Sequence, residues 1–261
     1  VFGLPYLLAG RVELPFPDVY GSARAGNLAL VANGHGGVQV IDLQDLARPY
    51  RVGFMKPAGA ARDVATRGGY AYVAASTQGL VVYDIQDPSF PQIATLDLFG
   101  VANRLTLDGD LAYITEMSGE GFDSRLTVVD ISDPFRPVVE RVIELIPSQV
   151  DRVPRGAYDV HVSGGKAFVT VQHADQVDAP IASMVEVIEL ERHGEPGVDA
   201  TTPVPVHRLT DASDPGARGV LYARGALHVA AGRQGLARVE LPALTVVDHE
   251  PGRGAGQVPT D

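Results

Sequence analysis

The chain has 261 residues, of which 45% are hydrophobic and none is cysteine, a composition typical of a folded protein that excludes disulfides and thiolate metal sites. Its 32 acidic and 21 basic residues give a net charge of −11, which argues against a nucleic-acid partner because such a partner requires a clustered basic surface. No segment approaches the ~20 consecutive apolar residues of a membrane-spanning helix, so no membrane span is expected.

The chain begins with a strand-like segment, residues 4–15, that aligns with the fourth strand of the repeats described below. As an outer strand of the last repeat, it would join the two ends of a ring. The last repeat also has its own candidate for that place in residues 244–250. We expect the N-terminal segment to close the ring, and the alternative is that the chain is an excerpt of a longer array.

The repeat is clearest in residues 61–98, where four short segments alternate apolar and polar residues and are rich in β-branched and aromatic side chains. The segments are RDVATR, YAYVAAS, LVVYDIQ and QIATLDL. This period of two residues predicts β-strands, and Gly68-Gly69 predicts a tight turn between the first two. Each repeat is therefore expected to form a four-stranded unit.

Five copies of this unit follow one another along the chain. Their expected boundaries are 22–57, 58–98, 99–145, 156–210 and 216–250. A repeat of four strands with this period predicts an all-β fold, namely a β-propeller of about five four-stranded blades in a single domain over residues 1–250. The Gly-rich residues 251–261 are expected to be a flexible tail.

Acidic residues recur at the ends of the third strands and in the turns that follow. The clearest are Asp84, Asp87, Asp130 and Asp133. Because aspartate in such turns binds its own backbone, repetition assigns these residues to turn structure and not to catalysis.

Two strings, GLVVYDIQDPSFP at 79–91 and RLTVVDISDPFRP at 125–137, resemble the LVIVD repeat. The resemblance is strong in the second and third copies, fair in the first, where Asp45-Leu46 replaces Asp-Pro, and weak in the last two. That family occurs in bacterial and archaeal surface or secreted proteins and is similar to β-propeller repeats. The resemblance implies a propeller in an extracytoplasmic location, that is secreted, periplasmic or at the cell surface, and it implies no catalytic residues.

In a propeller, the loops between fourth and first strands and those between second and third strands share one face, which often binds ligands. Polar residues at these positions are candidate ligand-binding residues: Arg62, Asp63, Asn103, Arg104, Tyr158, Asp159, His161, His173 and Arg218. They form either a polar central funnel for an anionic or sugar-like ligand, or a set of polar links between blades.

A metal site is the alternative to the expectation of no cofactor. Imidazole and carboxylate groups bind transition metals, and the candidates are His35, His161, His173 and Asp159. The acidic loops 119–124 and 173–180 are candidates for calcium, although we favour solvated loops because neither matches a known calcium-binding pattern. His228 lies inside an expected strand and is assigned to packing.

The sequence contains no Gly-x-Ser-x-Gly elbow and no phosphate-binding loop. Together with what the LVIVD resemblance implies, this leads us to expect a non-enzymatic extracytoplasmic binding or scaffold module that binds a protein, small-molecule or glycan ligand within a larger chain or assembly. The alternative is a metal-dependent hydrolase or lyase with an axial site.

Overall fold

The computed structural model describes residues 9–117, 124–145, 156–173, 182–190, 204–206, 217–231, 235–240 and 245–250. Within these ranges all regular elements are β-strands and no helix occurs, so none is present there that could cross a membrane. The prediction of an all-β fold is confirmed.

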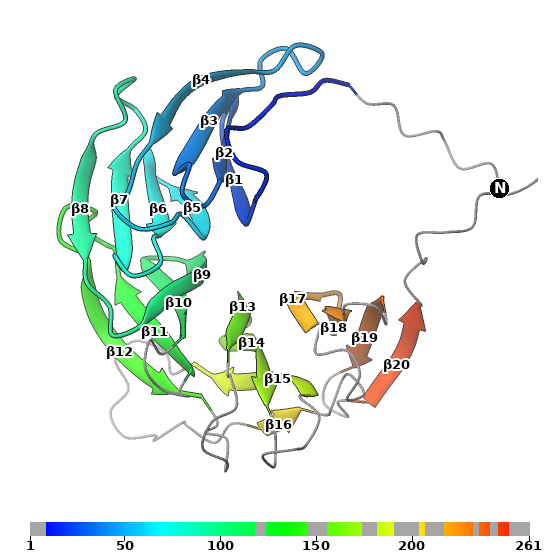
Figure 1. Ribbon diagram of the computed structural model, residues 1–261. Coiled ribbons are helices and arrows are strands. Elements are labelled where there is room, and N and C mark those ends of the chain that lie inside the picture. The colour runs from blue at the N-terminus through cyan, green and yellow to red at the C-terminus, as the bar shows by residue number, and fades with distance from the viewer. Residues whose placement is uncertain are drawn as a thin grey trace, which may run out of the picture. The chain divides into compact units, whose positions relative to one another are not determined.

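The described strands form five four-stranded sheets, and strand order within each sheet follows chain order (Figure 1). Sheet 1 consists of β1 (Gly21–Ala25), β2 (Leu28–Ala32), β3 (Val38–Asp42) and β4 (Tyr50–Met55). Sheet 2 consists of β5 (Asp63–Arg67), β6 (Tyr70–Ala74), β7 (Leu80–Asp84) and β8 (Gln92–Leu96). Sheet 3 consists of β9 (Val101–Asp108), β10 (Leu111–Met117), β11 (Ser124–Asp130) and β12 (Val138–Glu144). Sheet 4 consists of β13 (Ala157–Ser163), β14 (Lys166–His173), β15 (Ala182–Glu189) and β16 (Val204–Val206). Sheet 5 consists of β17 (Ala217–Ala223), β18 (Ala226–Ala231), β19 (Leu236–Glu240) and β20 (Thr245–Glu250).

The chain divides into two compact units. The first comprises Val1–Ala102 and Ser132–Pro137, and the second comprises Asn103–Ile131 and Val138–Asp261. Sheets 1 and 2 belong to the first unit, whereas sheets 4 and 5 and nearly all of sheet 3 belong to the second. The expected single domain over 1–250 stays a prediction.

The expected closing strand over residues 4–15 is not formed in its described part. Residues 9–14 have no regular secondary structure, and residues 4–8 lie outside the described ranges. The fourth place in sheet 5 is instead held by β20, which pairs with β19 in an antiparallel register. A strand that follows its partner after a short connection needs less loop closure than one from the opposite end of the chain.

Each sheet buries one face against a neighbouring sheet of the same unit. Leu30 of sheet 1 shares a buried cluster with Val73 of sheet 2, and Tyr113 of sheet 3 shares one with Val169 of sheet 4. We call the face that carries Leu30 in sheet 1, and the residues in register with it elsewhere, the forward face. Burying such a side chain stabilises the fold by about 1.5–3 kcal/mol.

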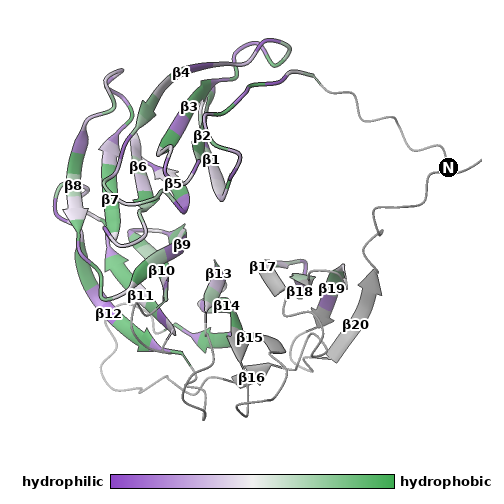
Figure 2. Cartoon of the chain, in the orientation of Figure 1, coloured by the Kyte–Doolittle hydropathy of each residue, from purple (hydrophilic) through white to green (hydrophobic). Residues whose placement is uncertain are grey.

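The repeated aspartates fix the turns that follow the third strands. Asp84 Oδ1 accepts a hydrogen bond from Gln86 N at 2.8 Å, Asp87 Oδ1 accepts one from Ser89 N at 2.8 Å, and Asp133 Oδ1 accepts one from Phe135 N at 2.9 Å. The Ser89 bonds hold the pKa of Asp87 below its usual range. Figure 2 shows β7 hydrophobic over most of its length before its turn. The assignment to turn structure is confirmed for these three residues.

A glycine is required where the third strand of sheet 2 begins. Gly79 has a φ of +79°, and a Cβ there would lie 2.3 Å from the carbonyl oxygen of Leu96. Gly37 holds the same place in sheet 1, where a Cβ would lie 2.2 Å from the carbonyl oxygen of Met55. In both sheets the last residues of the fourth strand approach too closely for any side chain.

We predict that Gly79→Ala destabilises the protein by about 2–4 kcal/mol, because a left-handed backbone cost adds to a backbone clash. The control is Gly68→Ala, whose φ of +59° is similar but whose Cβ would have no neighbour within 4 Å. The control should cost only about 1 kcal/mol. Urea denaturation at equilibrium measures both, and equal losses would contradict the requirement for close approach.

Candidate functional site

The first strands of the sheets share one register, which places their polar residues at equivalent positions. The pairs with the second strand at this position are Gly21–Ala32, Asp63–Ala74, Asp159–Thr170 and Gly219–Ala230. Asp63, Asp159 and Gly219 therefore occupy equivalent positions in their sheets.

In the first unit, Arg62 and Asp63 connect the first strands of sheets 1 and 2. The Arg62 guanidinium carbon lies 4.9 Å from the centre of the Tyr20 ring, a cation–π contact. The Asp63 carboxylate packs so closely on Gly21 that a Cβ there would lie 1.9 Å from Asp63 Oδ1. Asp63 Oδ1 also accepts a hydrogen bond from Val64 N at 2.9 Å. Both predicted site residues thus contribute to contact between the sheets.

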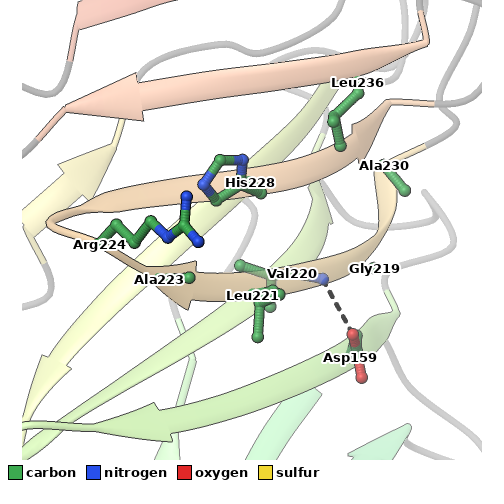
Figure 3. A pocket seen from close by; sticks show the side chains of 9 residues that line it. All are labelled: Asp159, Gly219, Val220, Leu221, Ala223, Arg224, His228, Ala230 and Leu236. Atoms are coloured by element: carbon green, nitrogen blue, oxygen red, sulfur yellow. Dashed lines mark hydrogen bonds between the residues drawn. The ribbon is translucent and has the colours of Figure 1, made fainter.

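In the second unit, polar side chains of the first strands bind the backbone of the next sheet. Asn103 Nδ2 donates to the carbonyl oxygen of Ala157 at 2.9 Å, from sheet 3 to sheet 4. Asp159 Oδ2 accepts a hydrogen bond from Val220 N at 2.9 Å, from sheet 4 to sheet 5 (Figure 3). These bonds match the interpretation of polar links between blades.

Burial raises the pKa of the Asp159 carboxyl above its ordinary value. Hydrogen bonds from Val220 and Val160, and the positive charges of Arg104 and His161, act in the opposite direction but do not outweigh the loss of solvent. The ionised form of Asp159 is therefore less favourable in the folded protein than in the unfolded chain, where water surrounds it.

Two further candidates lie at irregular points of the first strands. The register shifts between Ala157 and Asp159 in β13, and between Ala217 and Gly219 in β17. Tyr158 and Arg218 are therefore bulge residues, and bulges are frequent beside functional sites because they redirect a side chain. Tyr158 is half-buried, and the side chain of Arg218 lies outside the described part of the chain.

The candidate metal ligands are not brought together among the described residues. His35 is exposed in a turn of the first unit, whereas Asp159 and His161 lie on β13 in the second unit. His173 ends β14, and its side chain is not described. No three His, Asp or Glu side chains form a metal-binding group within the described ranges, and the two acidic loops lie almost wholly outside them. The metal site stays a prediction.

An open pocket of about 600 Å³ lies on the forward face of sheet 5. The residues that define it include Gly219, Leu221, Arg224, His228, Ala230 and Leu236, with Asp159 at its edge. Figure 3 shows Arg224 and His228 toward one end of the pocket and Asp159 at the other. The pocket starts where the first strands begin, at the end of the sheet predicted to bind ligand, and extends toward the β17–β18 turn.

The strand pattern did not single out Arg224, and the assignment of His228 to packing stays a prediction. His228 is half-buried on the pocket wall and is not part of the buried clusters. The strand pattern gave no sign that its face of the sheet is open. A signal for Arg224 was present, because in the first four copies the residue at its place in the turn is glycine.

The LVIVD repeat family matches residues 58–95 and 99–141. These are the second and third copies, in which the predicted resemblance is strongest. The comparison with curated proteins found no match.

Several solved structures resemble the chain at low sequence identity, which shows the fold alone. The Cps50 (Swd1) β-propeller domain of Myceliophteria thermophila has a TM-score of 0.63 at 13% identity, over 90% of this chain and 73% of that chain. BamB from Moraxella catarrhalis has a TM-score of 0.57 at 11% identity, over 90% of this chain and 77% of that chain. The computationally designed Ika8 protein has a TM-score of 0.58 at 9% identity over 89% of this chain, which spans only 61% of the Ika8 chain. The chain is therefore an all-β protein of the β-propeller type that contains LVIVD repeats at residues 58–95 and 99–141.

Proposed function

We propose that this propeller is a non-enzymatic binding or scaffold module, and that its ligand or partner contacts the end of the second unit where the first strands begin. The observation that carries the proposal is Asp159, a carboxylate with a raised pKa at the edge of an open pocket. Perturbed acids beside a concave surface are frequent at functional sites.

The neighbouring residues support the same place. Tyr158 occupies the bulge next to Asp159, and Gly219 has no side chain to fill the pocket between β13 and β18. A tyrosine offers both an apolar ring and a hydroxyl, which suits protein and glycan partners. The described polar groups bind backbone atoms of neighbouring sheets, as Asn103 and Asp159 do, which favours a rigid binding surface over catalysis.

The proposed location is extracytoplasmic, in a secreted, periplasmic or cell-surface protein. The support is the LVIVD repeat, which occurs in surface and secreted proteins. The proposed partner is a protein, a small molecule or a glycan and not a nucleic acid, because the chain carries a net charge of −11. No resident cofactor is proposed.

We predict that Asp159→Asn raises stability at neutral pH. The variant keeps an oxygen for the Val220 bond but removes the buried charge. The folded-state pKa of Asp159 is raised above the ordinary value of 3.8, so the folded protein favours the protonated carboxyl. The stability that this preference supplies is complete below pH 3.8 and is lost as the pH rises through the folded-state pKa. The advantage of the variant should therefore be greatest at neutral pH and should shrink on acidification.

Urea denaturation at a series of pH values measures this difference. A variant less stable than the wild type at neutral pH would show that the ionised carboxylate stabilises the fold on balance. Asp159 would then be a structural link and would not support a binding role.

We also predict that Tyr158→Ala weakens ligand binding at least tenfold, about 1.4 kcal/mol, as expected for an aromatic residue central to a contact. A thermal-shift screen of glycans and small metabolites against the wild-type protein supplies the ligands. Tyr50→Ala is the control, since Tyr50 is an exposed tyrosine of the first unit, 59% accessible. Ligands that bind both variants equally, or a stoichiometric metal that supports hydrolysis, would contradict the proposal.

A further inference from the structure

We propose that the pocket on the forward face of sheet 5 binds a small amphipathic carboxylate. Its anionic group would lie at Arg224 and His228, and its apolar body would lie on Leu221 and Leu236. This inference rests on the proposed binding function, since it names the ligand class of the same pocket.

The repeat register shows how sheet 5 differs from the others. At the centre of the forward face, the second and third strands of sheets 1 to 4 place the pairs Leu30–Val40, Tyr72–Val82, Tyr113–Val128 and Phe168–Val187. All of these side chains are buried, with at most 7% exposed. In sheet 5 the same register places His228 opposite Arg238. Two basic residues replace an apolar pair, so this face is not suited to the dry packing of the other sheets.

The turn between the first and second strands differs in the same sheet. Its first residue is a glycine with a φ between +57° and +60° in sheets 1 to 4, namely Gly26, Gly68, Gly109 and Gly164. In sheet 5 this residue is Arg224, with a φ of +52°. A left-handed backbone costs an arginine conformational energy that it does not cost glycine. Such strain is kept where the side chain has a use, and Arg224 borders the pocket.

The rest of the pocket is apolar and open. Leu236 is 45% exposed, although its counterparts in the other sheets, Val38, Leu80, Leu126 and Val185, are fully buried. Leu221, on the same face, is 49% exposed. Gly219 and Ala230 also border the pocket, and their small size leaves its space unfilled. A volume of about 600 Å³ lies within the range of small-molecule sites.

Charge decides both the class of ligand and its orientation. A guanidinium group can form two parallel hydrogen bonds with one carboxylate. Asp159 lies at the opposite end of the pocket, where it binds Val220, four residues or roughly 13 Å along the chain from Arg224, and would repel an anion there. The carboxylate therefore lies at the β17–β18 turn and the apolar body points toward Gly219.

The test compares 1-naphthylacetate with 1-naphthaleneacetamide, which has the same ring system without the charge, by isothermal titration calorimetry on the full chain. The carboxylate should bind at least about tenfold more tightly than the amide, as one charge-assisted hydrogen bond supplies. Arg224→Gly restores the residue of the other four turns, so its melting temperature should stay unchanged or rise while the preference for the carboxylate is lost. Arg24→Ala removes an exposed arginine of β1 as the charge-matched control and should keep the preference.

His228→Leu separates this proposal from the docking of a second copy. At a carboxylate site, leucine weakens naphthylacetate binding and leaves the protein monomeric in light scattering. If the face instead accepts the apolar sheet of another copy, leucine promotes association, which would overturn the proposal.

Equal affinities for the acid and the amide would also overturn it, as would an unchanged preference in Arg224→Gly. These results would leave the proposed function standing if ligands from the thermal-shift screen still depended on Tyr158. If the carboxylate preference were retained but ligand binding did not depend on Tyr158, the carboxylate site would stand and the proposed role of Tyr158 would be wrong.

Discussion

Face-to-face packing between sheets is the interaction on which this structure depends. A four-stranded sheet of short strands cannot enclose a core by itself, so its apolar residues are buried only when the next sheet covers them. The stacking of Phe168 on Tyr222, with ring centres 5.1 Å apart, is one such contact between sheets 4 and 5. The cost of a substitution therefore depends on whether its face of the sheet is covered.

The fold could be predicted from the sequence because its signals are local. Alternation of apolar residues indicated the four strands of sheet 2, and Asp84 and Asp87 marked the turn after β7, where they bind their own backbone. The N-terminal closing strand stays a prediction, because strand pairing is not local. Residues 4–15 have the pattern of a fourth strand, but a pattern does not select a partner, and β20 holds the place in sheet 5.

The candidate site was predicted only in part, for a related reason. Sequence register placed Asn103 and Asp159 at the starts of first strands, where the structure has them, and left their role open. Their bonds to Ala157 and Val220 show that a polar residue at this position can join two sheets. The surroundings of His228 could not be predicted, because alternation indicates which face a residue shares but not whether another sheet covers that face.

A repeat gives each position an expected residue, and a departure carries information when it has a cost. A polar residue on an exposed surface has little effect on the stability of the fold and therefore gives little information about function. Arg224 differs because it takes a left-handed backbone that four glycines adopt more easily, and because it does so beside an uncovered apolar surface. Since stability alone would favour glycine there, selection for a charge at that point is the simpler cause. The same reasoning applies to Asp159, whose raised pKa also marks a cost. Both residues border one pocket, which makes it the part of the chain where function is best sought.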